Sequence, residues 1–301
     1  MKDMKIKKVA VLGAGAVGSY VIWGLSKRED IRLGVVAEGA RAKRLAQGCK
    51  INDITYYPEV WNQQEAKGAD LLIVAVKYGA LPEALESIRM ITAEIGDDKV
   101  LRSLIKVASH KEGDGYYFNP ETTVGIIFGE LKEPYKSERV QAIEALFYDT
   151  GIHYRVTEYI QEEMWSKFRL NVCNNLPQAI LGAGVGCYVD SIHMKAISDG
   201  LRNELEAVAK AKGIDMSKTD ESSGRGSAVP ASARYSTLQD LDAGRHTEID
   251  MFSGALMRMG KELGIPVPYN EFTYHMIKAM EEKNDRKFDY TGERDKTTWA
   301  K

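Results

Sequence analysis

The first half of the chain alternates short apolar runs with stretches whose apolar residues recur at helical spacing. Strands are expected at Lys8–Leu12, Ile31–Ala37, Ala69–Lys77, Lys99–Val107, Val124–Phe128 and Ile152–Val156. Helices are expected at Ser19–Ser26, from Pro82 to about Ile95, and at Ser137–Tyr148. Residues 51–57 have the pattern of a hairpin around an Asn-Asp turn, and residues 109–115 that of a loop. The unbroken apolar run 69–77 indicates a central parallel strand buried on both faces.

After Thr157 the pattern becomes helical almost throughout. Helices are expected at Met164–Asn175, ending near Pro177, at Ser191–Lys212, from Ser236, from Thr247 to Gly264, and at Asn270–Glu282. Residues 217–233 are polar and rich in Gly and Ser, which favours a mobile loop, and the charged residues 283–301 are expected to fray. We therefore predict an α/β fold of two domains: residues 1–157, and an all-helical domain of residues 158–301.

Charge and composition restrict the partners. The net charge of -2 gives no reason to expect nucleic acid or an anionic membrane surface, so any anion site must be local. The three cysteines are few and widely spaced, which disfavours both a disulfide framework and a metal site. The histidines form no metal-ligand spacing, and we expect no metal. No segment reads as a secretory signal or membrane span, so a cytoplasmic protein is expected.

The strongest local motif is the glycine turn between the first strand and the first helix. It contains Gly13, Gly15 and Gly18, with Ala16 and Val17 opening the helix. Gly13 permits a tight turn, Gly15 lets the backbone approach a pyrophosphate, and Gly18 lets the helix pack close to the strand. The helix N-terminus offers N–H groups and a partial positive charge to that anion. The motif predicts that the first domain is a Rossmann-type dinucleotide-binding domain.

Two further positions bear on the cofactor. Glu38 ends the second strand where such folds contact the ribose, and an acid there accepts a hydrogen bond from a 2′-hydroxyl, which favours NAD. Arg41 and two more basic residues follow at once and are able to hold the 2′-phosphate of NADP, so the choice stays open. Lys77 ends the strand 69–77, where ligands bind in open α/β sheets, and is either a cofactor contact or a solvated charge.

In the second half, the helix 164–175 carries the candidate chemistry. Lys167 and Asn171 are four residues apart and Asn174 is seven from Lys167, so all three lie near one stripe. A lone lysine is usually a solvated charge, but shared amides and flanking aromatic residues indicate the wall of a cleft. Glu248 is the acid of interest, with an ordinary first-turn helix acid as the alternative.

Taken together, these residues resemble the ketopantoate reductase (2-dehydropantoate 2-reductase) family over nearly the whole chain. The resemblance rests on Gly13–Gly18, Val74–Lys77, Ile127–Glu130, Trp165–Lys167 with Asn171, Ser236–Asp240, Thr247–Asp250 and Gly264–Pro268. It implies a Rossmann domain, a helical second domain and a cleft between them in which NADPH reduces a branched 2-oxo acid. The helical second domain is of a kind that commonly supports a homodimer.

By this resemblance Lys167 matches the catalytic lysine, and the substrate-binding positions match Asn171, Asn175, Ser236 and Glu248. Helical geometry alone favours Asn174 over Asn175. The implied reaction is NADPH-dependent reduction of 2-dehydropantoate to pantoate in pantothenate and coenzyme A biosynthesis. Lys167 would act as the general acid, the amides and Ser236 would hold the carboxylate, and Glu248 would accept a hydrogen bond from the substrate hydroxyl.

The chain departs from the family in two places. The family usually carries an Asn-Gly after a strand of the form Val-Leu-Ser-Leu-Leu. In this chain, residues 96–101 pass directly to the strand that comes next, as though roughly two dozen residues were absent. Either the protein has lost a strand and its loop, or the sequence as printed omits them. The second departure is Glu38, where the family commonly has Arg. Two alternatives therefore remain: an NAD-dependent reductase of another 2-oxo acid, or a non-catalytic dinucleotide-binding protein.

Overall fold

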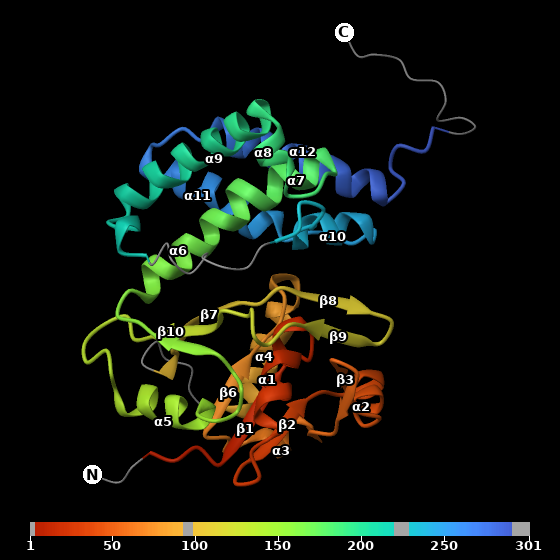
Figure 1. The fold of residues 1–301 in the computed structure, drawn as a ribbon, viewed down its shortest axis with the longest axis vertical. Coiled ribbons are helices and arrows are strands. Elements are labelled where there is room, and N and C mark those ends of the chain that lie inside the picture. Colours follow the sequence, from red (N-terminus) through yellow and green to blue (C-terminus); the bar gives the residue numbers. More distant parts are fainter. Residues whose placement is uncertain (1–3, 93–98, 220–228, 291–301) are drawn as a thin grey trace. The chain divides into compact units, whose positions relative to one another are not determined.

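The computed structural model describes residues 4–92, 99–219 and 229–290. The chain divides into two compact units: Met1–Met164 with Thr219–Gly226, and Trp165–Lys218 with Ser227–Lys301. In its described residues the first unit is mixed α/β and the second contains helices without strands (Figure 1). This confirms the predicted fold class.

A parallel sheet of four strands forms the centre of the first unit, in the order β5-β2-β1-β6. Its strands are β1 (Lys8–Leu12), β2 (Arg32–Val36), β5 (Glu59–Trp61) and β6 (Leu71–Val74). The helices of this unit are α1 (Ala16–Leu25), α2 (Gly39–Leu45), α3 (Gln63–Ala66), the short turn η1 (Tyr78–Ala80), α4 (Leu81–Ile91) and α5 (Glu138–Phe147). The predicted strands and helices of this region are confirmed within the described residues, with ends that shift by a few residues. The expected helix end near Ile95 lies outside the described residues.

The position of β6 in the sheet differs from the prediction. Within the described residues β6 pairs with β1 alone, and its last residue, Val74, is exposed. The next strand of the chain, β7 (Arg102–Lys106), pairs instead with β10 (Gly125–Gly129) in another sheet. The apolar run of β6 is therefore that of a strand at the edge of the described sheet, and the expectation of a central strand buried on both faces was wrong.

Two smaller sheets complete the first unit. One has the order β11-β10-β7, where β11 is Tyr154–Val156. The other has the order β4-β3-β9-β8, from β4 (Ile54–Tyr56), β3 (Cys49–Ile51), β9 (Gly115–Phe118) and β8 (Ser109–Glu112). The predicted hairpin at residues 51–57 is confirmed, and its Asn52 and Asp53 both have positive φ, as the favoured two-residue turns require.

The expected loop at residues 109–115 is instead a second hairpin, formed by β8 and β9. Its strand β8 has the sequence Ser-His-Lys-Glu, which carries no apolar alternation because this strand is largely exposed. Pairing with β9 supplies the missing order: His110 lies opposite Tyr117, and their rings stack at 5.6 Å between centroids. Cross-strand pairing of this kind leaves little trace in a local hydrophobic pattern.

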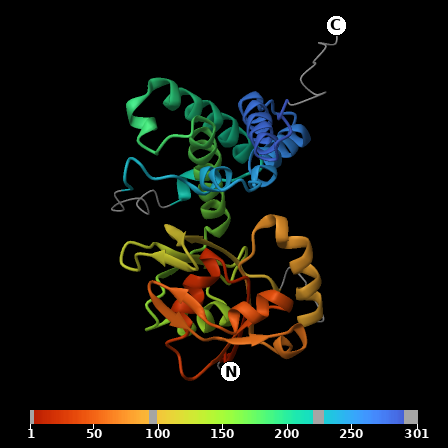
Figure 2. The same ribbon diagram turned by 90° about the vertical axis from the view of Figure 1, so that its right-hand side faces the viewer.

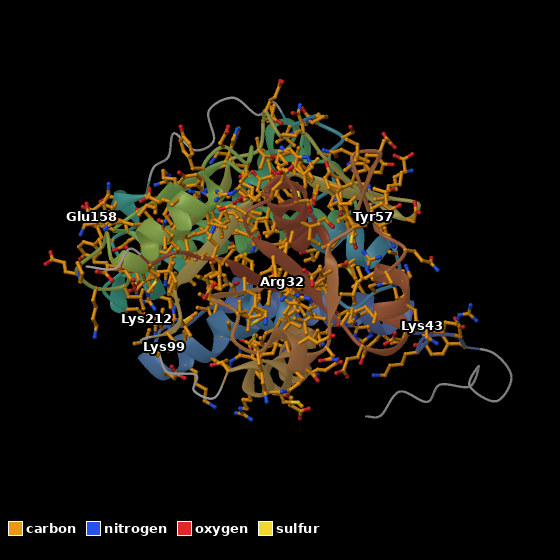
Figure 3. All side chains as sticks on the ribbon, turned by 90° about the horizontal axis from the view of Figure 1, so that it is seen from below. Arg32, Lys43, Tyr57, Lys99, Glu158 and Lys212 are labelled. Carbon is orange, nitrogen blue, oxygen red and sulfur yellow. The ribbon has the colours of Figure 1, made fainter. Side chains whose placement is uncertain are left out.

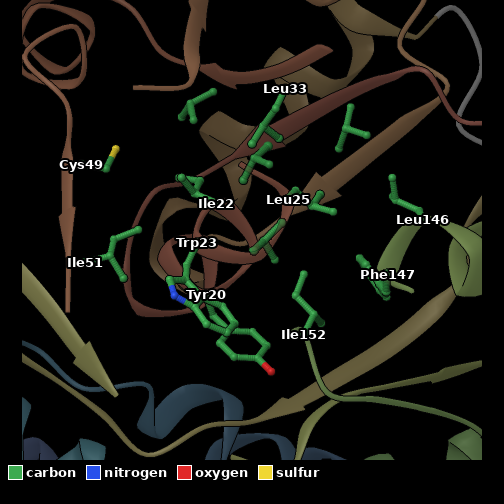
Figure 4. Packing of buried hydrophobic residues seen from close by; sticks show 14 of the residues in the cluster. Tyr20, Ile22, Trp23, Leu25, Leu33, Cys49, Ile51, Leu146, Phe147 and Ile152 are labelled. Carbon is green, nitrogen blue, oxygen red and sulfur yellow. The ribbon is translucent and has the colours of Figure 1, made fainter. Parts of the chain in front are cut away.

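Helix α1 is buried between these layers. Figure 4 shows Tyr20, Ile22, Trp23 and Leu25 pointing into the cluster that surrounds it. The rings of Tyr20 and Trp23 contact Phe118 of β9 edge-on, at 5.1 and 5.4 Å between centroids. The hydroxyl of Tyr20 accepts a hydrogen bond from the His153 N–H at 2.8 Å. Helix α1 is thus fixed by burial from Gly18 to Leu25, whereas the glycine turn before it is half-buried.

Hydrogen bonds and an ion pair connect residues at the amino ends of the strands in the parallel sheet. The Asp70 carboxylate accepts hydrogen bonds from the N–H groups of Lys7 and Lys8, at 2.8 and 2.9 Å. Arg32, labelled in Figure 3, forms an ion pair with Glu59 at 2.6 Å. At their carboxyl ends, β1 leads into the glycine turn, β2 into α2 and β6 into η1.

The second unit is built from helices, most of which contribute residues to one hydrophobic core. They are the end of α6 (Ile160–Leu170), the π-helical turn η3 (Asn171–Asn175), α7 (Leu176–Leu181), α8 (Cys187–Asp190), α9 (Ile192–Ala211), η4 (Met216–Lys218), α10 (Ser236–Asp242), η6 (Ile249–Met251), α11 (Ser253–Leu263) and α12 (Pro268–Asn284). Helices α9 and α12 lie side by side (Figures 1 and 2). Buried Glu204 of α9 accepts hydrogen bonds from the N–H groups of Tyr269 and Asn270, which caps the start of α12.

The change of period after Thr157 lies close to the start of α6. The boundary between the units falls inside this helix, between Met164 and Trp165. Its first turn stays with the first unit because Glu163, 1% exposed, forms ion pairs with Lys106 and Arg155. Most of the loop expected at residues 217–233, and the end of the charged tail, lie outside the described residues. Within the described ranges, no helix combines the length and apolar character that a bilayer crossing requires.

Candidate functional site

The glycine turn has a separate structural requirement at each glycine. Gly13 has φ +103°, and a Cβ there would lie 2.5 Å from the carbonyl oxygen of Ala75. A Cβ on Gly18 would lie 1.9 Å from the carbonyl oxygen of Gly13. Both positions therefore exclude a side chain, one by backbone conformation and both by close packing. The strand–glycine–helix geometry that the sequence predicts is present.

Gly15 differs from the other two because a Cβ there would meet no atom within 4 Å. It precedes α1, whose first turn contains Ala16 and Val17 and no acidic side chain. The first N–H groups of a helix have no acceptor within the helix, so they face this open space with a partial positive charge. The residues present therefore fit the pyrophosphate of a dinucleotide, with room for it beside Gly15.

The residues expected at the ribose of the cofactor lie together after β2. Glu38 is the N-cap residue of α2 by its backbone, but its side chain makes no capping hydrogen bond. Arg41 follows in the first turn of α2, and both side chains are exposed. Lys43, labelled in Figure 3, lies in the last turn of the same helix. An acid and bases thus stand within one short helix, and the geometry leaves the NAD or NADP preference open.

Lys77 lies beyond the carboxyl end of β6, which ends at Val74. It is the N-cap residue of η1 by its extended backbone, and its side chain is exposed. The segment before it packs on the glycine turn: Ala75 N–H donates to the Leu12 carbonyl at 2.8 Å, and Ala75 faces Gly13. Lys77 therefore lies two residues after a residue that packs on the glycine turn. Its role as a cofactor contact stays a prediction.

In the second unit, Lys167 is half-buried on α6, and the helix continues from it into the π turn η3. The prediction that this helix ends near Pro177 was wrong, because it continues through α7 to Leu181. A proline inside an α-helix removes one hydrogen bond and clashes with the carbonyl four residues earlier. The π turn changes the hydrogen-bond ladder just before Pro177, which then occupies the first turn of α7, where a proline is tolerated.

The same π turn decides which asparagine accompanies Lys167. In an uninterrupted α-helix Asn174, seven residues on, lies nearer the Lys167 stripe than Asn175. A π turn contains more residues than an α turn, so each residue rotates less about the axis. Asn175 is thereby turned toward the stripe that Lys167 and Asn171 share, and its amide donates a hydrogen bond to Asn171 Oδ1 at 3.1 Å. The assignment of Asn175 to substrate binding stays a prediction.

Asn175 also carries an unsatisfied buried atom. The residue is 4% exposed, and its Oδ1 has no hydrogen-bond partner among the described residues. The hydroxyl of Thr237, 2% exposed, is in the same condition. Buried polar atoms in native proteins are nearly always paired, so such an atom calls for a ligand or water. A carbonyl oxygen requires a donor, such as a hydroxyl.

Ser236 begins α10, which packs against both η3 and α7, and its side chain is exposed. Gln178, fully buried on α7, fixes the segment that leads to Ser236. Its Oε1 accepts from the Tyr235 N–H at 2.8 Å, and its Nε2 donates to the Ala233 carbonyl at 2.9 Å. Sequence reasoning missed Gln178, because its partners Ala233 and Tyr235 lie more than 50 residues further along the chain.

Glu248 does not stand in the first turn of a long helix, as the predicted helix from Thr247 to Gly264 implied. That expectation was wrong: the half-buried Glu248 precedes the short 3-10 turn η6, and α11 begins only at Ser253. Phe252 separates the two with φ −97° and ψ −102°, outside the helical region. The ordinary first-turn explanation for this acid therefore does not apply. Among the residues that the structure describes, no group of His, Cys, Asp or Glu is able to hold a metal ion.

Comparison with known proteins assigns both halves of the chain. Residues 9–95 match the family model described as ketopantoate reductase PanE/ApbA, and residues 159–281 match its C-terminal model. A 2-dehydropantoate 2-reductase of Pyrobaculum aerophilum is 27% identical, covering 90% of this chain and 97% of that protein. One from Archaeoglobus fulgidus is 22% identical, covering 92% and 99%.

Solved structures show the same fold. A PanE/ApbA family ketopantoate reductase of Ralstonia eutropha has a TM-score of 0.79 at 23% identity, covering 92% of this chain and 99% of that one. A ternary complex of D-mandelate dehydrogenase with NADH and anilino(oxo)acetate has a TM-score of 0.75 at 19% identity, with the same coverage. A dimeric ketopantoate reductase of Staphylococcus aureus has a TM-score of 0.70 at 16% identity, again with this coverage.

Proposed function

Since this chain belongs to the ketopantoate reductase family, we propose that it reduces 2-dehydropantoate to pantoate with NADPH, a step of pantothenate and coenzyme A biosynthesis. More broadly it is an NAD(P)H-dependent 2-oxo acid reductase. The observation that carries the specific proposal is the π turn η3. It turns Asn175 toward the stripe of Lys167 and Asn171, where Asn175 donates a hydrogen bond to Asn171 and keeps a buried amide oxygen for a ligand.

In this proposal, residues of the first unit bind the cofactor. The nicotinamide cofactor, when bound, supplies the hydride. Gly13, Gly15 and Gly18 shape the turn that receives its pyrophosphate, together with the N–H groups of the first turn of α1. Lys77 contacts the cofactor from the end of β6. Glu38 and Arg41 contact the ribose end, and Arg41 supplies the positive charge for a 2′-phosphate.

The helical unit handles the substrate. Lys167 donates a proton to the ketone oxygen as negative charge develops there. Ser236 and Asn171 donate hydrogen bonds to the substrate carboxylate. Asn175 presents its amide oxygen to a donor on the substrate, and Glu248 accepts a hydrogen bond from the substrate hydroxyl. A site built to pair with a hydroxyl discriminates strongly against 2-oxo acids that lack one.

Replacing Lys167 by Ala tests this assignment. General acids contribute about 10²- to 10⁴-fold to rate, so kcat for 2-dehydropantoate should fall by that factor. The dissociation constant of NADPH, measured by fluorescence titration, should stay unchanged because Lys167 acts on the substrate. Lys212 is an exposed lysine of the same unit, at the C-cap of α9, and Lys212→Ala is the matched control that should behave as wild type. Near-wild-type turnover by Lys167→Ala would refute the assignment.

The position of β6 at the edge of the described sheet favours a second candidate, a dinucleotide-binding protein without catalysis. The family's Asn-Gly segment belongs between β6 and β7, and residues 93–98 lie outside the described residues. NADPH binding without any consumption in the presence of 2-dehydropantoate would support this candidate. A panel of 2-oxo acids assayed with NADH and NADPH tests the remaining alternative, another substrate, which the NADH complex of the D-mandelate dehydrogenase neighbour suggests.

We further propose a cytoplasmic homodimer, in line with the dimeric reductase of Staphylococcus aureus. Light scattering of the purified protein should give about twice the chain mass of 33.5 kDa. A mass of one chain would contradict the dimer, and recovery of the protein in a membrane or secreted fraction would contradict the location.

A further inference from the structure

Three side chains of α12 lie at positions i, i+4 and i+7: Tyr274, Lys278 and Glu281. This spacing places them on one stripe of the helix. All three contact the segment that carries Glu248, through its neighbours Thr247 and Asp250. The contacts therefore hold the chain on both sides of Glu248.

On the first side, the contact is between Glu281 and Thr247. Glu281 is 2% exposed, and its Oε1 accepts hydrogen bonds from both the backbone N–H and the hydroxyl of Thr247, each at 2.7 Å. The Thr247 hydroxyl in turn accepts from the Ile249 N–H at 3.2 Å. The residues directly before and after Glu248 are thus tied to one buried carboxylate.

On the second side, the contacts are to Asp250. The Tyr274 hydroxyl donates to its carboxylate at 2.8 Å, and the Lys278 ammonium lies 3.5 Å from it. Arg258 of α11 donates to the Asp250 carbonyl oxygen at 3.0 Å. The turn η6 is therefore anchored beyond Glu248 as well as before it.

Lys278 forms ion pairs with the carboxylates on both sides of Glu248. Its ammonium lies 3.1 Å from Glu281 Oε2 as well as 3.5 Å from Asp250. Burial lowers the pKa of Lys278, but the hydrogen bond to Glu281 and the charges of Glu281 and Asp250 outweigh this and raise it overall. The buried Glu281 carboxylate consequently has a permanent counter-ion, without which its burial would be unfavourable.

We propose that Glu281 is a positioning residue for Glu248: with Tyr274 and Lys278 it clamps the turn that presents Glu248 to the substrate. The presentation of Glu248 rests on the function proposed above, whereas the clamp itself does not. A short 3-10 turn has few hydrogen bonds of its own, so fixing it requires contacts of this kind. A side chain that binds one hydroxyl must be held closely if the discrimination is to be large.

Amide hydrogen exchange tests the clamp without any activity. Glu281→Gln and Thr247→Val each remove part of the paired set, Val being close to Thr in shape, and should speed exchange in peptides covering residues 246–252 at least tenfold. Thr247→Ser keeps the hydroxyl and should exchange as wild type. Glu282→Gln makes the same chemical change at the neighbouring residue, which pairs with Lys287, and is the matched control. Equal exchange in wild type and both disrupting variants would overturn the clamp, as would equal acceleration throughout the second unit.

Kinetics test the link to Glu248. If wild type turns over 2-dehydropantoate, Glu281→Gln and Thr247→Val should raise its KM about tenfold or more and leave the KM of NADPH unchanged. Thr247→Ser should restore the wild-type value. An unchanged KM for 2-dehydropantoate in both disrupting variants would overturn the positioning role. Absence of turnover in wild type would refute the proposed function, and the exchange measurement would still decide the clamp.

Discussion

Alanine at Gly18 should lower stability, whereas alanine at Gly15 should weaken NADPH binding, although the two residues are three positions apart in one turn. At Gly18 the new Cβ would lie 1.9 Å from the Gly13 carbonyl oxygen, so the backbone itself has to move. Overpacking of this kind costs typically up to about 3 kcal/mol. For a domain of this size we expect Tm to fall by roughly 6–12 °C.

At Gly15 the new Cβ would meet nothing, and the residue has φ −83°, which alanine adopts freely. Alanine is a poorer N-cap than glycine, but it also lowers the entropy of the unfolded chain, and the two effects nearly cancel within about 1 kcal/mol. The fold should therefore be unaffected. The methyl group would instead occupy the space proposed for the pyrophosphate, so NADPH should bind at least tenfold more weakly, about 1.4 kcal/mol.

Thermal unfolding and NADPH fluorescence titration on both variants provide the comparison. The reasoning requires a stable Gly15→Ala protein with weakened binding and a destabilised Gly18→Ala protein. Wild-type affinity for NADPH in Gly15→Ala would refute the role of the open space beside Gly15. An unchanged Tm in Gly18→Ala would refute the packing argument.

Three further predictions concern other parts of the chain. The guanidinium of Arg139 lowers the pKa of Glu130, so Glu130→Gln should cost about 1.5–3 kcal/mol in urea unfolding at pH 7, and this difference should shrink as the pH falls below about 4 and Glu130 protonates in the folded state. Cys187 is the partly exposed cysteine and the other two are buried, so a maleimide should label one thiol in the native protein and three in urea. Glu38→Ala should raise the preference for NADPH over NADH and Arg41→Ala should lower it, as steady-state kcat/KM with each cofactor would show; no change in either variant would contradict the ribose assignment.

Much of the first unit follows from local sequence. The run before Gly13, the glycines and the apolar helix after them predict β1, the turn and α1 without further information. The Asn52-Asp53 turn likewise specifies its hairpin, because both residues tolerate positive φ. These features depend on neighbours a few residues apart, so a local pattern contains them.

The features that the sequence did not determine depend on residues far apart in the chain. Whether β6 is a central or an edge strand depends on a strand supplied from elsewhere, and the apolar sequence of β6 is the same in both cases. The exposed strand β8 is ordered by β9 rather than by its own pattern.

The candidate site divides in the same way. The types and spacing of Lys167, Asn171 and Glu248 are visible in the sequence, since helical periodicity and family motifs report them. Only the folded chain shows the π turn that rotates Asn175 toward the stripe of Lys167, and the contact of Glu281 with Thr247, 34 residues earlier in the chain. Local patterns record the backbone preferences of adjacent residues, whereas these arrangements result from packing between elements, which no single stretch of sequence encodes.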